Sequence, residues 1–437
     1  MSWLQRYRIR LYLRNSIWIL PAISIPTALL AVTIVVRIDQ AFGWQVNIGP
    51  DTARSIMSTV ASSMFTLVVL VSSTVLVAVQ LASAQLTPRI IALIYRNPYR
   101  KLALATFIFT FTFSVAVLIR IEDRVPLLAA YLAAYGFLLN LALFLFFVDG
   151  MGKTLRPSSA FRSVGLAARK IVHTVYPSPL KEGDPKPEEI QIRLKGQPRV
   201  VCSIDDGAVL GFHRKGLMAL AVKSNCVIEL MPEVGDFIAA GDPLFRIHES
   251  GSDLSDGALR DLVAIGHERT LEQDPLFAFR IIVDIANKAL SPAVNDPTTA
   301  VLAIDQIHHL LRDIGTRYLA EGYERDTTAR LRLIYRTPNW EDFVHLGTTE
   351  IRQYGRESIQ IQRRLRAMLE NLIETLPERR APVLRKELAL LTTSSKRSFP
   401  DLDDQNLAEA ADLQGIGGNY DEIPEHDSTV NGVHPNR

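Results

Sequence analysis

The chain has 437 residues, of which 48% are hydrophobic and 22% are charged, and its formal net charge is +2. This small charge, without a basic stripe interleaved with aromatic residues, argues against nucleic-acid binding. Two cysteines are too few for a disulfide framework, so we expect Cys202 and Cys226 to be free thiols in a reducing compartment. The averages hide a division of the chain, because long apolar blocks stand before Gly152 and charged residues are dense after it.

Four apolar blocks within residues 1–151 predict an α-helical, multi-pass transmembrane domain. They run from Ile17 to Val36, from Ile56 to Leu81, from Leu102 to Ile119 and from Val125 to Val148. Each is close to the ~20 residues that a helix needs to cross ~30 Å of hydrocarbon. Four such lengths in series argue against the alternative interpretation, a helical domain buried within a soluble protein. A cleaved signal peptide is disfavoured because the first block is too long and no small-residue cleavage site follows it.

The charges between the blocks predict how the helices cross the membrane. Basic residues gather before the first block, between the second and third, and after the fourth: Arg6, Arg8, Arg10, Arg14, Arg89, Arg96, Arg100, Lys101, Lys153, Arg156, Arg162, Arg169 and Lys170. The opposite ends hold only Arg37, Arg54, Arg120 and Arg124, among Asp39, Asp51, Glu122 and Asp123. By the positive-inside rule, both termini lie in the cytoplasm. Trp18 and Trp44 flank the first block, where interfacial aromatic residues are expected.

The second block is unusually rich in hydroxyl side chains. At 100° per residue, one face of the predicted helix carries Ser55, Ser62, Thr66, Ser73 and Gln80. A polar face within lipid either packs against neighbouring helices or lines a wet passage. Both interpretations stay open, and in the second these five residues line a pore in an oligomer. No acidic or basic residue lies mid-membrane in any block, which argues against a proton relay or ion-coupled transport.

Residues 152–189 predict a juxtamembrane helix followed by a linker. From Gly152 to Tyr176 basic residues alternate with apolar ones, a pattern typical of an amphipathic helix that rests on anionic lipid headgroups. The stretch from Pro177 to Pro187 is rich in Pro, Lys and Glu, and indicates a domain boundary.

Residues 190–250 predict a small β domain. Its candidate strands are Arg199–Ile204, Ala208–Phe212, Met218–Val222, Cys226–Met231 and Leu244–Ile247. The stretch from Val234 to His248 resembles a half-motif of barrel-sandwich hybrid domains, and the resemblance implies that Phe237 and Leu244 point into a small core. Carriers of that fold place a modifiable lysine at a hairpin tip. Lys223 lacks their flanking pattern, so we expect no lipoyl or biotinyl group.

Residues 251–414 predict a helical domain, and residues 415–437 a disordered tail. Asp274-Pro275 and Asp296-Pro297 each pair an N-capping aspartate with a proline that has no amide to lose, so a helix is expected after each. The further elements expected are a short strand at Leu331–Tyr335 and amphipathic helices near Trp340–Tyr354, Ser358–Thr375 and Arg379–Leu391. The polar, glycine-rich composition after residue 415 is typical of disorder. The predicted fold class is therefore a four-helix transmembrane bundle followed by a cytoplasmic α+β region.

One group of polar residues is the candidate site of the helical domain: His267, Glu268, Arg269, Asp274, Asn295 and Asp296. Two interpretations stay open, structural capping of the helix starts and a ligand or anion site at the helix N-termini. The group does not contain a zinc-protease motif, because Leu271 stands where the second histidine is needed. Asp305, His308 and His309 have helical spacing for a metal, but hydrogen-bonded histidines are the simpler interpretation. Without a nucleophile, phosphate-binding or dinucleotide motif, the sequence predicts no enzymatic reaction, no catalytic residue, no cofactor and no metal.

Three motifs resemble a known family: Gln80–Arg89, Gly266–Pro275 and Ala289–Ala300. They are similar to the predicted membrane proteins of the domain-of-unknown-function 2254 family, and the resemblance extends from about Arg14 to Leu391. It implies a bacterial inner-membrane protein with this same layout. It implies no particular reaction or substrate.

Together these patterns predict a multi-pass inner-membrane protein that is oligomeric and channel-like or transporting, and is gated by its cytoplasmic domain. The partners expected are the lipid bilayer, further copies of the chain, and a small cytosolic ligand or protein. The alternative is a non-conducting membrane scaffold or sensor that recruits cytosolic partners. An enzyme with a site around His267, Glu268 and Asp296 is a weaker third interpretation.

Overall fold

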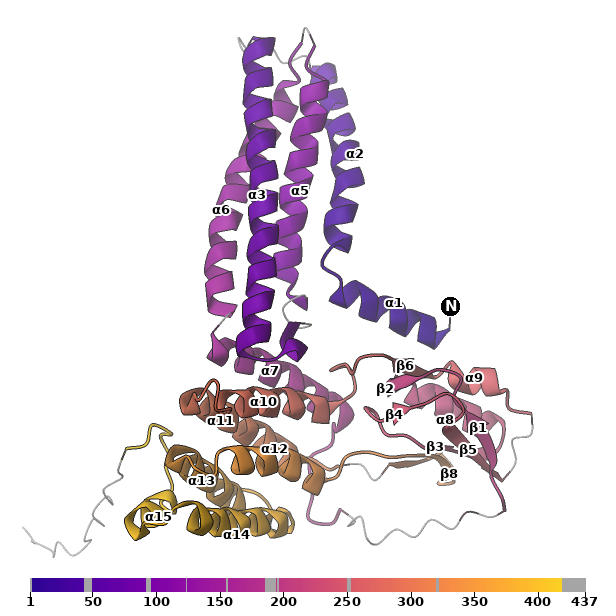
Figure 1. Cartoon of the computed structure of the whole chain (residues 1–437). Coiled ribbons are helices and arrows are strands. Elements are labelled where there is room, and N and C mark those ends of the chain that lie inside the picture. The colour runs from indigo at the N-terminus through magenta and orange to yellow at the C-terminus, as the bar shows by residue number, and fades with distance from the viewer. Residues whose placement is uncertain are drawn as a thin grey trace, which may run out of the picture.

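The computed structural model describes residues 2–42, 49–91, 96–122, 124–154, 156–184, 194, 196–249, 253–319 and 322–418. Trp44, Asp123, most of the predicted linker from residue 185 onward, and residues 419–437 of the predicted tail lie outside this range. Long helices form a bundle at one end of the molecule (Figure 1), and the C-terminal region (residues 156–418) lies at the other end.

The bundle consists of α2 (Ile19–Phe42), α3 (Pro50–Gln85), α5 (Pro98–Ile119) and α6 (Leu127–Thr154). All four are long and apolar enough to cross a membrane, which confirms the predicted number of spans within the described residues. Their core contains Met57, Met64, Phe113 and Val117. A polar contact also joins two helices, because Nδ2 of Asn140 donates to Oγ1 of Thr110 at 2.7 Å. Such hydrogen bonds fix helix pairs in an apolar surrounding.

Helix α1 (Trp3–Asn15) lies on the same side of the bundle as the C-terminal region (Figure 1). Its apolar residues pack on Leu210 and Ala264 of the β region described below. The hydroxyl of Tyr7 donates to the carbonyl oxygen of Leu210 at 3.3 Å. The N-terminal helix and the C-terminal region are therefore on one side of the membrane helices.

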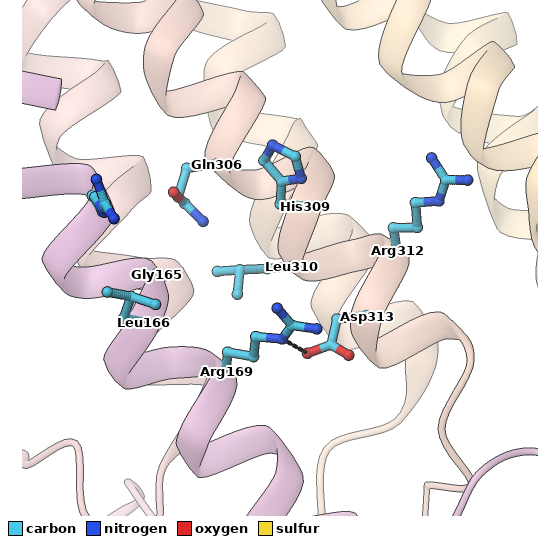
Figure 2. Close-up of a pocket in the computed structure, with 9 residues that line it drawn as sticks. Gly165, Leu166, Arg169, Gln306, His309, Leu310, Arg312 and Asp313 are labelled. Atoms are coloured by element: carbon cyan, nitrogen blue, oxygen red, sulfur yellow. Dashed lines mark ion pairs between the residues drawn. The ribbon is translucent and has the colours of Figure 1, made fainter.

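Helix α7 (Pro157–Val175) begins directly after α6 and crosses α11 (Pro297–Gly315), as Figure 2 shows. It is amphipathic as predicted, with Val164, Ala168, Ile171 and Val172 buried. The predicted contact of its basic residues with lipid headgroups stays a prediction, and its apolar face is not available to lipid. That face belongs to the main core of the C-terminal region, because the apolar faces of α10 and α11 need a covering helix.

The β region contains two sheets. One has the order β1-β5-β3-β8-β7 and the other β4-β2-β6. The strands are β1 (Arg199–Cys202), β2 (Gly207–Phe212), β3 (Cys226–Leu230), β4 (Phe237–Ile238), β5 (Pro243–Glu249), β6 (Val263–Gly266), β7 (Tyr323–Arg325) and β8 (Leu331–Tyr335). β8 confirms the predicted strand, and it pairs in parallel with β3. Strands β6, β7 and β8 come from the part of the chain after residue 250. Cys202 and Cys226 are free thiols, as expected.

Two expectations for the β region were wrong. Residues 218–222 do not form a strand but belong to helix α8 (Arg214–Lys223), because Leu217 and Ala221 are one helical turn apart and both bury against the sheets. Leu244 is buried as expected, whereas Phe237 is 76% exposed. In the two-residue strand β4 only one side chain can face the core, and Ile238 takes that position. A short helix, α9 (Asp256–Arg260), precedes β6.

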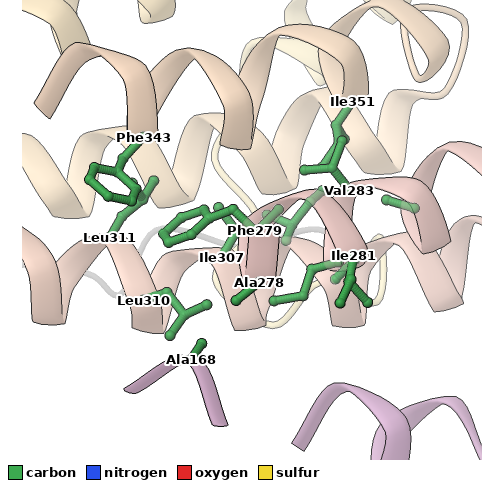
Figure 3. Packing of buried hydrophobic residues seen from close by; sticks show 14 of the residues in the cluster. Ala168, Ala278, Phe279, Ile281, Val283, Ile307, Leu310, Leu311, Phe343 and Ile351 are labelled. Atoms are coloured by element: carbon green, nitrogen blue, oxygen red, sulfur yellow. The ribbon is translucent and has the colours of Figure 1, made fainter. Parts of the chain in front are cut away.

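The helical part contains α10 (Pro275–Ala289), α11, α12 (Trp340–Tyr354), α13 (Ile359–Thr375), α14 (Ala381–Ser398) and α15 (Leu402–Ala408). Figure 3 shows the packing at its centre, where the rings of Phe279 and Phe343 lie 5.3 Å apart beside Ile307 and Leu311. The predicted tail is not free at its start. Nε2 of Gln360 on α13 donates to the carbonyl oxygen of Gly415 at 2.7 Å, and Nη2 of Arg363 donates to that of Gly418 at 2.9 Å, so residues 415–418 lie against the helical part.

Candidate functional site

Helix α3 links the membrane bundle to the C-terminal region. Its 36 residues make a rod of about 54 Å at 1.5 Å per residue, well beyond the ~30 Å of the hydrocarbon core. The face that packs within the bundle carries Ala53, Met57, Val60, Met64 and Val71. These positions recur every three, four or seven residues, which places them along one side of the helix.

The predicted hydroxyl face lies on the opposite side of α3. Ser55, Ser62, Thr66, Ser73 and Gln80 are all exposed in the single chain. Two hydroxyls on this side are satisfied by their own helix, because Oγ1 of Thr66 donates to the carbonyl of Ser62 at 3.0 Å and Oγ1 of Thr59 donates to that of Ser55 at 2.9 Å. The stripe therefore faces outward from the protomer and not toward α2, α5 or α6.

The last turns of α3 are built into the core of the C-terminal region. Ala82 and Leu86 belong to the same buried cluster as α7, α10 and α11, and Ile90 of the short 3₁₀ helix η1 (Pro88–Ile90) belongs to it too. Nζ of Lys288 on α10 donates to the carbonyl oxygen of Ser83 at 3.0 Å. A cation is favourable there, because the last carbonyls of a helix lack partners within it.

An ion-pair network continues from this junction. Arg89 of η1 pairs with Asp284 of α10. Asp284 also accepts from Nε of Arg280 at 2.6 Å, and Arg280 binds both carboxylate oxygens of Glu350 on α12, at 2.6 and 2.7 Å. The hydrogen bonds from Arg280 lower the pKa of Glu350. A displacement of α10 or α12 thus reaches α3 through charged, directional contacts as well as through packing.

Asp274 and Arg269 lie at a polar junction between the β region and the helical part. Oδ1 of Asp274 accepts from the amide of Phe277 at 2.9 Å and caps α10, while its Oδ2 accepts from Nε and Nη2 of Arg269 at 2.9 and 2.7 Å. Asp274 is only 2% exposed. Its role in the described structure is that of a cap with a paired charge.

A cavity of about 180 Å³ adjoins this junction, lined by Thr174, Val175, Phe212, Arg214, Glu233, Val234, Gln273, Asp274, Pro275, Tyr335, Arg336, Thr337 and Pro338. Burial, and then the nearby charge of Asp236, raises the pKa of Glu233 to about 7. Helix α7, both sheets and α10 thus meet around the carboxyl group of Glu233.

The other candidate residues lie elsewhere. Asp296 accepts from the amide of Thr299 at 3.0 Å and caps α11, and its own amide donates to the carbonyl of Ala289, the last residue of α10. The caps Asp274 and Asp296 therefore lie at opposite ends of α10, about 22 Å apart for 15 residues. Asn295 is exposed with a φ of 47°, and His267 and Glu268 are exposed in the segment between β6 and α10. The six residues do not form one cluster.

The residues with metal-like spacing on α11 contact α13 instead. Asp305 pairs with Arg364 at 2.6 Å, and Nε2 of His308 lies 2.9 Å from Oδ1 of Asn371. Within the described ranges no group of three or more His, Cys, Asp or Glu side chains is arranged to hold a metal ion.

Sequence reasoning missed the residues that attach α3 to the C-terminal region. Arg89 ends the motif Gln80–Arg89, where the sequence indicates only a positive charge outside the membrane. Lys288 lies on a helix 205 residues further along the chain, so no local pattern connects it with Ser83. The basic residue that directly follows an overlong apolar helix was the one available signal.

The chain matches the model of a family described as "Predicted membrane protein (DUF2254)" over residues 14–371. It is 26% identical to an uncharacterized protein of Mycobacterium bovis, over 96% of this chain and 82% of that protein. An uncharacterized protein of Mycobacterium tuberculosis is similar to the same degree. No solved structure matches this chain. The family match confirms the resemblance carried by the three sequence motifs.

Proposed function

Because the chain belongs to the DUF2254 family of predicted membrane proteins, we propose that it is an oligomeric, channel-like protein of the bacterial inner membrane. In this proposal α3 lines a pathway between copies of the chain, and the C-terminal region gates it from the cytoplasm. Both termini are cytoplasmic, since the basic residues gather on the side of α1 and α7. The proposal includes no enzymatic reaction and no cofactor.

One observation carries the proposal: helix α3 has an outward hydroxyl stripe in its apolar part, and its last turns lie inside the core of the C-terminal region. The bundle leaves Ser62, Thr66 and Ser73 facing away from the protomer. Polar faces within a membrane are generally found against protein or water. A second copy of the chain supplies both, when several α3 helices surround one axis.

The attachment of α3 favours control from the C-terminal region. Lys288 and the Arg89–Asp284 pair hold the C-terminal end of α3. The helix is continuous from this end to the other membrane surface. A continuous helix moves as a unit, so a rearrangement of α10 reaches the stripe. The β region completes the gate in this proposal, with its barrel-sandwich-like segment Val234–His248 as the part that binds a cytosolic ligand or partner.

The test is salt release from liposomes that contain the full chain. Wild-type protein, Thr66→Leu and Thr27→Leu are reconstituted with potassium chloride inside, and K⁺ release is recorded with an ion-selective electrode. Thr27 is the matched control, because it is exposed on α2 and its hydroxyl donates to the carbonyl of Ile23 at 2.8 Å, as that of Thr66 does to Ser62. Thr66→Leu should lower release severalfold and Thr27→Leu should not. Equal release from all three, or none above protein-free liposomes, overturns the pathway.

A second function, a non-conducting membrane sensor or scaffold, is favoured by one observation. The hydroxyls of Thr59 and Thr66 are already satisfied by backbone carbonyls, so the stripe tolerates lipid without any water. In that case the same liposomes release no K⁺, while Arg89→Gln still alters the protease sensitivity of the C-terminal region, because the pair with Asp284 is lost.

A further inference from the structure

Helix α1 carries apolar side chains on two opposite faces. Trp3, Tyr7 and Leu11 belong to the face that packs on the β region. At about 3.6 residues per turn, a residue two positions further along lies on nearly the opposite side of a helix, so Ile9 and Leu13 point away from that face. Both are exposed, with 43% and 50% of their surface accessible to solvent. Contact with the β region therefore explains only one of the two apolar faces.

Contacts at the end of α1 place it beside the starts of two membrane helices. Nζ of Lys101, in the first turn of α5, donates to the carbonyl oxygens of Leu13 and Arg14 at 3.2 and 2.7 Å. Nε of Arg96, just before α5, donates to Oδ1 of Asn15 at 2.8 Å. Helix α2 begins soon after α1 ends. The level of α1 along the bundle is therefore fixed by the residues that lead into α2 and α5.

Exposed aromatic residues indicate a membrane boundary at the level of α1. They are Tyr12 of α1, Trp18 directly before α2 and Tyr99 in the first turn of α5. Tyrosine and tryptophan are enriched where membrane helices leave the hydrocarbon core. Figure 1 shows α1 crosswise to α2 at the end of the bundle, with the β region beyond it. Because the β region lies against one face of α1, the exposed face is turned toward the membrane boundary.

Arginines border the exposed face of α1. Arg6 and Arg10 each lie three positions before one of its two aliphatic residues, and are therefore their neighbours on the helix surface. Arg8 and Arg14 pair with carboxylates of the C-terminal region, at 3.4 and 3.0 Å. Arg6 and Arg10, in contrast, are exposed and have no acidic partner among the residues that the structure describes. Two positive charges thus remain for an anion outside the described part of the chain.

We propose that the exposed face of α1 lies in the headgroup layer of the adjoining leaflet, with its aliphatic residues toward the acyl chains and with Arg6 and Arg10 on anionic phosphates. Helices with an apolar face bordered by basic residues bind membrane surfaces in this way, and a guanidinium fork matches the oxygens of a phosphate. The opposite face holds the β region, since the ring of Trp3 stacks on that of His213 with 5.4 Å between their centroids. Helix α1 thereby attaches the β region to the lipid surface. The inference rests on the membrane location of α2 and α5, and it does not depend on conduction.

The experiment uses the full chain in liposomes and a fluorescent label that reports contact with lipid. In a Cys202→Ser background, which leaves only the buried Cys226, Ile9→Cys is labelled with a nitrobenzoxadiazole group. A phospholipid with a doxyl group near the headgroup end of its acyl chain quenches the label where the two are in contact. Leu390→Cys is the matched control, because Leu390 is an exposed aliphatic residue within α14, which lies far from the bundle (Figure 1).

The label at Ile9→Cys should be quenched severalfold more strongly than the label at Leu390→Cys. Equal quenching at the two positions overturns the proposal. A label at Ile9→Cys that is not quenched, but whose emission is shifted to the blue, also overturns it, because a second copy of the chain or another protein then covers this face.

A second comparison tests the two arginines. The liposomes contain either phosphatidylcholine alone or a mixture with phosphatidylglycerol, and Arg6→Gln/Arg10→Gln is combined with the label at Ile9→Cys. The anionic lipid should increase quenching by about twofold or more, and Arg6→Gln/Arg10→Gln should abolish this increase. The control, Lys386→Gln/Lys396→Gln, removes two exposed charges from α14 and should leave the increase unchanged. Quenching that does not respond to the headgroup charge, or an increase that survives the loss of both arginines, overturns the contact with anionic lipid.

Discussion

Nζ of Lys288 donates to the carbonyl oxygen of Ser83 at 3.0 Å and joins the middle of the C-terminal region to the last turn of a membrane helix. The two residues are 205 positions apart in the chain. The ammonium group lies where the dipole of α3 is negative, so the contact combines a hydrogen bond with a favourable charge.

Replacing Lys288 with methionine tests this contact. Methionine keeps the length of the side chain but leaves the carbonyl of Ser83 without its donor, so we expect a loss of about 1–2 kcal/mol in the free energy of unfolding. This corresponds to a melting temperature lower by about 2–4 °C in detergent. Lys215→Met on α8 is the control, because Lys215 is exposed. Equal melting temperatures for the two variants would contradict the contact.

The membrane helices and the helix starts could be predicted from sequence because their causes are local. An apolar block of the right length specifies a span, and Asp274 and Asp296 each cap the helix that follows them directly. The strand predicted at residues 218–222 was wrong because a short continuous run of apolar residues is compatible with both a buried strand and a short helix. Only the position of α8 against the sheets decides between the two.

The candidate site was harder to predict, because it depends on contacts between distant parts of the chain. Because Asp274 and Asp296 each start a helix, the sequence suggests that they share one polar cluster. In the structure the whole length of α10 separates them. The approach of Lys288 to Ser83 follows from how α3 and α10 pack. No periodicity within one segment reports such packing.

The separation of the two caps predicts that they act independently. Asp296→Ala should cost about 1 kcal/mol through the lost cap, and Asp274→Ala about 2 kcal/mol, because Arg269 also loses its partner. In the double variant the two losses should add within about 0.5 kcal/mol, as for distant sites. Chemical denaturation of the four proteins measures the coupling. A coupling energy well above this limit would show that the two aspartates share one site.

Gly235 is predicted to be sensitive to substitution because of its side-chain neighbours. It has a φ of +100°, and a Cβ there would lie 2.1 Å from Nη2 of Arg269, so alanine must push Arg269 away from Asp274. Gly241 is a matched control, with a φ of +94° and nothing within 4 Å of its Cβ position. Both alanine variants carry the backbone strain of about 1 kcal/mol, and Gly235→Ala should lose about 1–2 kcal/mol more.

Thermal unfolding of the two glycine variants, alone and combined with Arg269→Ala, checks this steric cause. Removing Arg269 relieves the closest steric conflict, while Oδ2 of Asp274 still lies 2.7 Å from the Cβ position, so the difference between Gly235→Ala and Gly241→Ala should shrink in that background. An undiminished difference without Arg269 would contradict a role of Arg269 in the effect.

Glu233 predicts how stability depends on pH. Burial, with a further contribution from Asp236, raises the pKa of its carboxyl from 4.5 to about 7 in the folded protein. The folded state then holds the proton more tightly than the unfolded state does, so stability falls as the pH rises from about 4.5 to about 7 and levels off above that. Glu233→Gln carries no charge at any pH. It should melt about 2–4 °C above wild type at pH 8, and close to wild type at pH 5.

The control for this pH dependence is Glu374→Gln, because Glu374 is exposed near the end of α13. Melting curves at both pH values should give the same difference from wild type for this control. A stabilisation by Glu233→Gln that is equal at pH 5 and pH 8 would assign the effect to packing. A gap that opens only at the higher pH instead ties the junction of α7, the sheets and α10 to the ionisation of this single carboxyl group.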